Sequence, residues 1–258
     1  MAGFKSYYRG PMLNIGVRIQ LDKGEAHHLV GVLRARNGDK VTLFNGLGGV
    51  WEGIIDISSK NAFLTVISEL NIEKPKCNLI LAQSLSKGKG MDEILQKATE
   101  IGVAKIIPLK TDRTELKLDA ERETKRMERW RTIVIEACKQ SGNFFIPEIV
   151  EIQRIKNFLR ECFFMENTLK LTASLEVGAK LLNNYFLREF ELPSSIIWLI
   201  GPEGDFTSRE YKLAFECGFK PISLSRNVLR VETAAIYALS ITDYEINSRL
   251  GNAQLENF

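Results

Sequence analysis

Ile196-Ile197-Trp198-Leu199-Ile200-Gly201-Pro202-Glu203-Gly204 is the stretch that decides the fold of this 258-residue chain. Its apolar half, rich in isoleucine, predicts a buried strand. Gly-Pro-Glu-Gly then predicts a tight turn, because proline fixes φ and glycine lets the backbone approach a ligand closely. Thr207 and Glu210 follow with the spacing of a capping box, which predicts a helix that Gly218 ends.

The same order of elements is repeated once more. Pro221 to Leu224 predicts a second strand, Ser225 to Arg230 a second turn, and Val231 opens the last helix. We therefore expect both turns at the carboxyl ends of neighbouring strands in a parallel sheet, the edge where open α/β sheets bind ligands. Gly-Pro-Glu-Gly alone could equally be a plain connection. The pair of turns is more specific for a ligand site.

The amino-terminal part of the chain is typical of a small antiparallel β-barrel. Asn45-Gly46 is a strong hairpin signal. Between the first two strands, Glu25 to Arg36 predicts a short helix with His28, Val32 and Leu33 facing inward. The expected strands are residues 17–21, 40–44, 50–57 and 62–67.

A short polar segment, Glu73 to Lys76, reads as a linker, so we expect two domains, residues 1–72 and 76–258. Beyond the linker, expected strands alternate with expected helices, which is typical of an α/β domain. The strands are residues 77–83, 105–109 and 170–173, and the helices are residues 91–101 and 121–141.

Composition excludes several classes of protein. With 45% hydrophobic and 26% charged residues, the chain is globular. It has no run of about eighteen apolar residues and no apolar leader, so we expect a soluble, cytoplasmic protein without a membrane span. The four cysteines lie far apart and there are two histidines, so we expect no metal site. A net charge of +3 is too small to demonstrate a nucleic-acid partner.

Two segments closely resemble the cofactor-binding motifs of the SPOUT methyltransferases. They are Leu199 to Gly204 and Leu224 to Ala234, the latter reading LSRNVLRVETA. Within that superfamily the chain resembles the RsmE family, which methylates N3 of a uridine in 16S ribosomal RNA. Asp205 and Ser225 stand where the family usually has glycine. The resemblance extends back to His28, through an H-x-x-x-V-L-R pattern, an S-K-G-x-x-M loop and an E-A-x-x-Q-S run.

This resemblance implies a fold and partners that spacing alone does not give. We expect a carboxyl-terminal α/β SPOUT domain with a deep trefoil knot and an amino-terminal PUA-like β-barrel that helps to hold RNA. The implied cofactor is S-adenosyl-L-methionine, with no metal. The implied partners are 16S rRNA, within the assembled small ribosomal subunit, and a second copy of the chain in a homodimer.

The resemblance also places the site residues. The residues expected to bind the cofactor are Ala173, Leu199, Ile200, Gly201, Glu203, Gly204, Leu224, Ser225, Asn227, Val228, Leu229, Thr233 and Ala234. The polar loop after residue 173, with Ser174, is expected to form a third wall of the pocket. The residues expected to contact RNA are Arg9, Arg34, Lys87, Lys89, Arg113 and Gln140.

Arg230 and Glu232 are the expected catalytic residues. Uracil N3 carries a proton in the neutral base, so methylation requires that this proton leaves or that negative charge on the flanking carbonyl oxygens is stabilised. Arg230 can stabilise that charge, and Glu232 can orient the arginine or accept the proton. A structural alternative is that Arg230 pairs with Glu232 only to cap the last helix.

Two alternative functions stay open. The chain could be a SPOUT methyltransferase that acts on tRNA or on another rRNA position, because cofactor motifs do not name the acceptor. It could also be a non-catalytic RNA-binding protein. Asp205, and Asn143 in place of a common arginine, would favour that second alternative.

Overall fold

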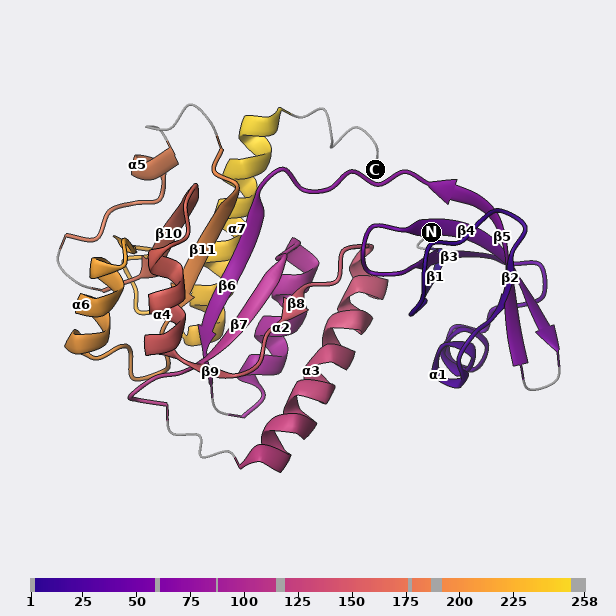
Figure 1. The fold of residues 1–258 in the computed structure, drawn as a ribbon, viewed down its shortest axis with the longest axis horizontal. Helices are drawn as coiled ribbons and strands as arrows, with labels where there is room; N and C mark the ends of the chain where they lie inside the picture. The colour runs from indigo at the N-terminus through magenta and orange to yellow at the C-terminus, as the bar shows by residue number, and fades with distance from the viewer. Residues whose placement is uncertain are drawn as a thin grey trace. The chain divides into compact units, whose positions relative to one another are not determined.

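The computed structural model describes residues 3–58, 61–86, 88–114, 119–175, 178–186 and 192–251. The chain forms two compact units (Figure 1). The first unit contains the residues up to 74 together with 135–146, and the second contains 75–134 and the residues from 147 onward. Helix α3 (Ala120–Ser141) therefore contributes residues to both units.

The first unit is built on a five-stranded sheet. The sheet order is β1 (Phe4–Tyr7), β3 (Lys40–Phe44), β4 (Val50–Ser58), β5 (Asn61–Leu70) and β2 (Arg18–Gln20). The expected strands and the Asn45-Gly46 turn are confirmed, with φ of +78° at Gly46. The expected antiparallel pairing is found among β2, β3, β4 and β5, but β1, which was not expected, pairs in parallel with β3. A four-residue strand carries too short a pattern to be recognised in the sequence.

The expected helix between β2 and β3 is shorter and partly widened. Helix α1 (Lys23–Ala26) continues into the π-helix η1 (His27–Val32). Leu33 N donates to His28 O, five residues back, and this wider turn rotates the following side chains. The expectation that Val32 and Leu33 face inward was therefore wrong, since they are 59% and 41% exposed. Leu29 and Ala35 are buried instead.

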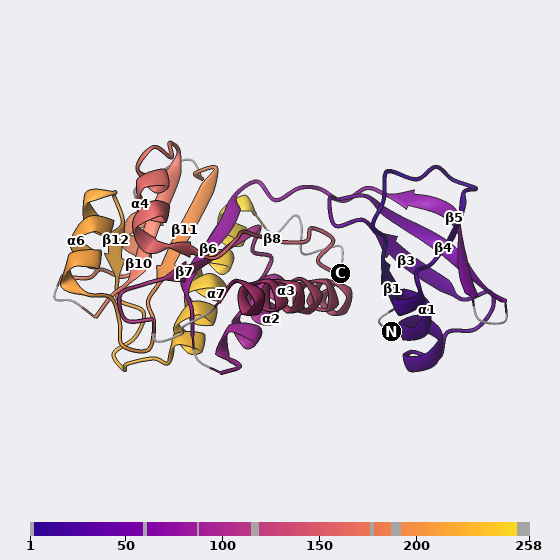
Figure 2. The ribbon, with the colours of Figure 1, turned by 60° about the horizontal axis from the view of Figure 1, so that its bottom comes forward.

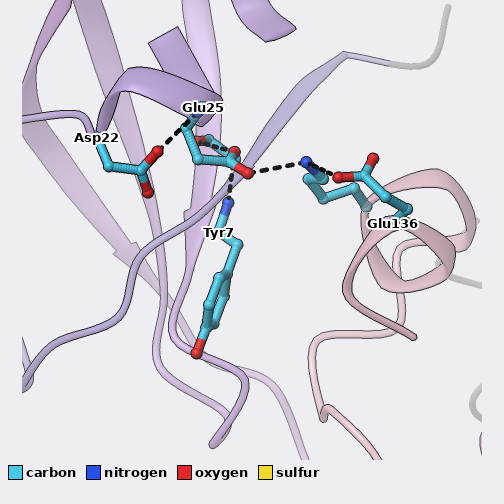
Figure 3. Close-up of polar contacts among 6 residues, drawn as sticks. Tyr7, Asp22, Glu25 and Glu136 are labelled. Atoms are coloured by element: carbon cyan, nitrogen blue, oxygen red, sulfur yellow. Dashed lines mark hydrogen bonds and ion pairs between the residues drawn. The ribbon is translucent and has the colours of Figure 1, made fainter. Parts of the chain in front are cut away.

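The last turns of α3 are joined to helix α1 of the first unit by a buried ion pair (Figure 3). Lys139 Nζ lies 2.8 Å from Glu25 Oε1 and 2.6 Å from Glu136 Oε1. The other oxygen of Glu25 accepts hydrogen bonds from Ser6 Oγ at 2.7 Å and from Tyr7 N at 3.1 Å. Lys139 and Glu25 are both buried, so each charge depends on the other.

The second unit is built on a parallel sheet. Its order is β12 (Lys220–Ile222), β10 (Thr168–Ala173), β11 (Ser195–Ile200), β6 (Asn78–Ser84), β7 (Lys105–Lys110) and β8 (Glu148–Ile149), and β9 (Gln153–Arg154) also pairs with β7. All of these pairings are parallel. The expectation that β11 and β12 are neighbours was wrong, because β10 lies between them. The carboxyl ends of three adjacent strands thus share one edge.

Helices cover both faces of this sheet (Figure 2). Helices α4 (Ile155–Phe163) and α6 (Ser208–Glu216) pack on the face that carries Leu199. On the other face, Trp198 Nε1 donates to Thr242 Oγ1 of α7 (Val231–Leu250) at 2.8 Å, and α7 packs against α2 (Gly90–Ile101). Helix α5 (Asn183–Phe186) is short. The apolar run Ile196 to Ile200 is buried on both faces, as a central parallel strand requires.

Cys77, Cys138, Cys162 and Cys217 are buried free thiols, as the sequence predicts. None of the helices in the described part of the chain has the length and apolar character that crossing a membrane needs.

Candidate active site

A cavity of about 520 Å³ opens at the carboxyl edge of the parallel sheet. Most of its lining comes from residues 173–175 at the end of β10, residues 200–203 and 205 at the end of β11, and residues 224, 225, 227–232 and 234 between β12 and the first turn of α7. Tyr211 of α6 completes the wall. The volume falls within the range of about 300–1,000 Å³ that is typical of small-molecule sites. The two turns singled out in the sequence and the loop after β10 therefore surround one cavity.

Most of the residues expected to bind the cofactor line this cavity. They are Ala173, Ile200, Gly201, Glu203, Leu224, Ser225, Asn227, Val228, Leu229 and Ala234. Three others do not line it. Leu199 is fully buried in the sheet, where its carbonyl accepts a hydrogen bond from Thr172 Oγ1 at 3.0 Å. Gly204 lies just beyond the turn, and Thr233 is exposed on the first turn of α7.

Sequence reasoning missed part of the wall. Asp205 was noted only as a departure from the family pattern, yet this residue lines the cavity. Tyr211 lies one turn into α6, and its hydroxyl donates to Asp205 Oδ1 at 2.8 Å. The position of Asp205 directly after the motif Leu199 to Gly204 could have identified it as a residue that lines the cavity. Nothing in the sequence distinguished Tyr211 from an ordinary core residue.

The turn after β11 is held by contacts with the loop after β7. The capping box is confirmed, with Thr207 N donating to Glu210 Oε2 at 2.9 Å. The other oxygen of the buried Glu210 accepts a hydrogen bond from Asp112 N at 2.9 Å. Arg113 Nη1 donates to Gly204 O at 2.6 Å. Arg113, which was expected to contact RNA, thus supports the turn that lines the cavity, and its contact with RNA stays a prediction.

The two expected catalytic residues both line the cavity, at the start of α7. Arg230 is the exposed N-cap residue of that helix. Arg230 and Glu232 are both described, and no ion pair joins them, so the alternative that they pair only to cap α7 is not supported.

Glu232 lies against the amino terminus of α2 instead. A Cβ atom built on Gly90 would lie 2.5 Å from Glu232 Oε1 and 2.9 Å from Ser86 Oγ. Only glycine leaves this space for the carboxylate. The amino terminus of a helix also attracts negatively charged side chains.

The carboxyl end of β6, next to Glu232, contains unusual buried polar atoms. Gln83, Ser84 and Ser86 have no exposed surface. Within the described part of the chain, Gln83 Oε1, Ser84 Oγ and Ser86 Oγ have no hydrogen-bond partner. Buried polar atoms are nearly always satisfied, so this edge of the sheet carries polar groups that packing alone does not explain.

The residues expected to contact RNA are distributed over both units. Arg9, Arg34 and Gln140 are exposed in the first unit, and Lys89 is the exposed N-cap residue of α2 in the second. Lys87 lies outside the described residues. Arg34 has a φ of +61°, which non-glycine residues seldom adopt. Their contacts with RNA stay predictions.

Two family models match the chain. One is described as an RNA methyltransferase domain and matches residues 73–243. The other is described as an RNA methyltransferase PUA domain and matches residues 21–67. A relative from Synechocystis sp. named ribosomal RNA small subunit methyltransferase E is 35% identical over 228 residues, which cover 88% of this chain and 73% of that protein. The protein of the same name from Bacillus subtilis is 29% identical over 86% of this chain and 88% of that protein.

Solved structures are similar over nearly the whole chain. A methyltransferase from Legionella pneumophila, in complex with bound S-adenosylmethionine, has a TM-score of 0.85 and 34% identity, covering 96% of this chain and 98% of that one. Ribosomal RNA small subunit methyltransferase E from Neisseria gonorrhoeae, bound to S-adenosylmethionine, has a TM-score of 0.84 and 32% identity, covering 93% and 96% of the two chains.

Proposed function

The chain belongs to the RNA methyltransferase family, and from this premise we propose that it methylates N3 of a specific uridine in the 16S rRNA of the small ribosomal subunit. The protein is an rRNA methyltransferase that uses S-adenosylmethionine. Its fold, an amino-terminal PUA domain and a carboxyl-terminal α/β methyltransferase domain, confirms the expectation from the sequence. The observation that carries the proposal is the cavity at the carboxyl edge of the sheet, formed by the segments whose sequence resembles the family's motifs.

The residues of this cavity fit the cofactor. Backbone turns and apolar side chains such as Leu224 and Leu229 suit an adenine ring, and Glu203, Asp205 and Glu232 suit the positive charges of the methyl donor. S-adenosylmethionine, when bound, supplies a methyl group that is already activated on a sulfonium. The protein must then orient the acceptor and exclude water. We assign the cavity-lining residues named above to cofactor binding.

Arg230 and Glu232 are placed to act on the acceptor base. Both lie on the wall of the cavity, and Arg230 is exposed at the start of α7, where incoming RNA can reach it. Its guanidinium stabilises the negative charge that develops on the uracil carbonyl oxygens as N3 loses its proton. Glu232 accepts that proton from its position beside the amino terminus of α2.

The proposal includes the assembly and its setting. We propose a knotted methyltransferase domain, which is supported by the return of α7 from the edge strand β12 to pack against β6 and β11 at the centre of the sheet. We propose a homodimer, supported by Tyr237 and Tyr244, which are 44% and 72% exposed and two turns apart on α7. The acceptor, 16S rRNA in the assembled subunit, implies the cytoplasm.

Mass spectrometry of small-subunit RNA from cells with and without the gene tests this proposal. We expect one N3-methyluridine to disappear when the gene is deleted and to return when it is restored. The E232Q variant serves as the matched negative control for the restoration. Loss of a methyl group from tRNA, or from another rRNA position, would replace the acceptor that we propose. Unchanged RNA together with no calorimetric binding of S-adenosylmethionine would favour a non-catalytic RNA-binding protein.

A further inference from the structure

Asp205 has a backbone conformation that side-chain-bearing residues seldom adopt. Its φ is +62°, in the left-handed region, and it is the last residue of the turn that lines the cavity. Glycine adopts this conformation without strain, whereas aspartate tolerates it only at a cost. A strained residue on the wall of a ligand site is a candidate for a functional role.

The carboxylate of Asp205 is held in one orientation. Oδ1 accepts a hydrogen bond from Phe206 N at 2.8 Å and another from Tyr211 OH at 2.8 Å. A Cβ built on Gly201 would lie 3.2 Å from the same oxygen, so the turn itself packs close to it. Within the described part of the chain, no hydrogen bond to Oδ2 is found. One oxygen therefore anchors the group, and the other is available to a ligand in the cavity.

The charge around the cavity is mainly negative. Among the described residues, Glu203, Asp205 and Glu232 line it, and Arg230 is the one lysine or arginine that does so. S-adenosylmethionine and its product S-adenosylhomocysteine share the adenine, the ribose and the amino acid. They differ by one methyl group and by the positive charge on sulfur. A fixed carboxylate in a partly enclosed site attracts the positively charged sulfonium and does not attract the uncharged thioether in the same way.

We propose that Asp205 is a specificity-determining residue of the cofactor pocket, whose fixed carboxylate favours the positively charged methyl donor over the uncharged thioether product. This inference rests on the assignment of the cavity to the cofactor in the proposed function. Discrimination of this kind limits inhibition by the product, because the uncharged product lacks the electrostatic attraction between the carboxylate and the sulfonium of the donor. Glycine at this position would give an unstrained turn without that discrimination.

Calorimetric titration of the full chain with each of the two compounds tests the proposal. D205N keeps the size of the side chain and removes its charge, and D205G also relieves the strain. We expect the ratio of the Kd of S-adenosylhomocysteine to that of S-adenosylmethionine to fall about fivefold in both variants, as expected for loss of one nearby charge interaction. E216Q, which removes an exposed charge on α6 outside the cavity, should leave the ratio unchanged.

The outcomes separate this inference from the proposed function. An unchanged ratio in D205N, or equal weakening of both compounds, would overturn the role of Asp205 while leaving the cofactor assignment intact. Equal weakening would instead indicate a hydrogen bond to a group that the two compounds share. Failure of the wild-type chain to bind either compound would overturn the cofactor assignment and this inference together. A Tm measured for every variant shows that the change in ratio does not come from unfolding.

Discussion

Gly90 is the residue that allows Glu232 to reach the amino terminus of α2. A Cβ at this position would lie 2.5 Å from Glu232 Oε1, the far end of a flexible side chain. We predict that Gly90→Ala leaves the fold intact but displaces the carboxylate, so that methyl transfer falls about tenfold or more while S-adenosylmethionine still binds. Single-turnover methylation and calorimetry measure the two quantities. Gly3→Ala is the matched control, because nothing lies within 4 Å of the added Cβ.

Arg230 is the residue to which we assign stabilisation of charge on the acceptor base. Removing one such donor typically lowers kcat by about 10²–10³-fold. We therefore predict that Arg230→Ala slows single-turnover methylation by about two orders of magnitude, with little change in the Kd of S-adenosylmethionine. Arg226→Ala removes an exposed arginine of the same turn that does not line the cavity, and it should retain activity. Equal turnover by the two variants would remove Arg230 from the mechanism.

At the residue scale, the sequence predicted the site residues that come directly after a strand. The turn at Gly201 and the segment from Leu224 line the cavity because parallel strands place their carboxyl ends at one edge. It failed where a contact depends on how a helix packs. The position of Tyr211 beside Asp205, and that of Gly90 beside Glu232, join segments whose proximity no local pattern encodes.

At the scale of elements, helix α3 depends on a buried ion pair. Lys139 and Glu25 are both buried, and breaking such a pair by removing one partner typically costs about 3–5 kcal/mol, because the remaining charge is left without compensation. We predict that Lys139→Met lowers the free energy of unfolding by about that amount at pH 7. Urea denaturation measures it. Lys212→Met, on the exposed side of α6, should be nearly neutral. A neutral Lys139→Met would show that the pair adds nothing.

The same pair predicts a dependence on pH. Burial alone would lower the pKa of Lys139, but hydrogen bonds to Glu136 and Glu25 outweigh it and raise the pKa above the ordinary value of 10.5. A lysine whose pKa is higher in the folded than in the unfolded chain stabilises the fold. This stabilisation is complete at any pH below the pKa of the unfolded chain, and it is lost as the pH rises through the pKa of the folded chain. We expect the stability difference between the wild type and Lys139→Met to stay constant from pH 7 to pH 10 and to shrink above that range. Denaturation at several pH values measures the trend.

The helix between β2 and β3 shows why this element was only partly predictable. The pattern from Glu25 to Arg36 fits a regular helix, and its inward positions follow from a period of 3.6 residues. The hydrogen bond from Leu33 N to His28 O, five residues back, adds one residue to the turn and shifts every later position. A wider turn leaves no mark in the hydrophobic pattern, so the sequence pointed to Val32 where the structure buries Leu29.

At the scale of the whole molecule, the sequence did not predict which segments make up the first unit. Residues 135–146 belong to it although they come long after the expected linker. The contacts responsible join distant segments: Ile146 N donates to Gly46 O at 2.9 Å, and Phe44 packs on Phe144 with ring centroids 5.6 Å apart. A linker can be read from local composition. Contacts of this kind depend on the folded chain.

The proposed homodimer gives the prediction that belongs to the whole molecule. Tyr237 and Tyr244 expose aromatic surface on one side of α7, the helix that begins at the residues we propose to be catalytic. Burying these rings against a second copy would remove apolar surface from water, whereas a carboxylate there would be costly to bury. We predict that the wild type sediments at twice its monomer mass of 29.2 kDa. The double variant Tyr237→Glu/Tyr244→Glu should sediment as a monomer and lose methyl transfer.

A matched variant separates this interface from a general effect of added charge. Phe164, at the end of α4, is 80% exposed, and Phe164→Glu introduces the same carboxylate at another exposed ring. We expect this variant to remain a dimer with wild-type activity. A wild-type monomer that is fully active would contradict the homodimer. A dimeric Tyr237→Glu/Tyr244→Glu variant would place the interface on another face, because two carboxylates buried without partners would not be tolerated at the contact.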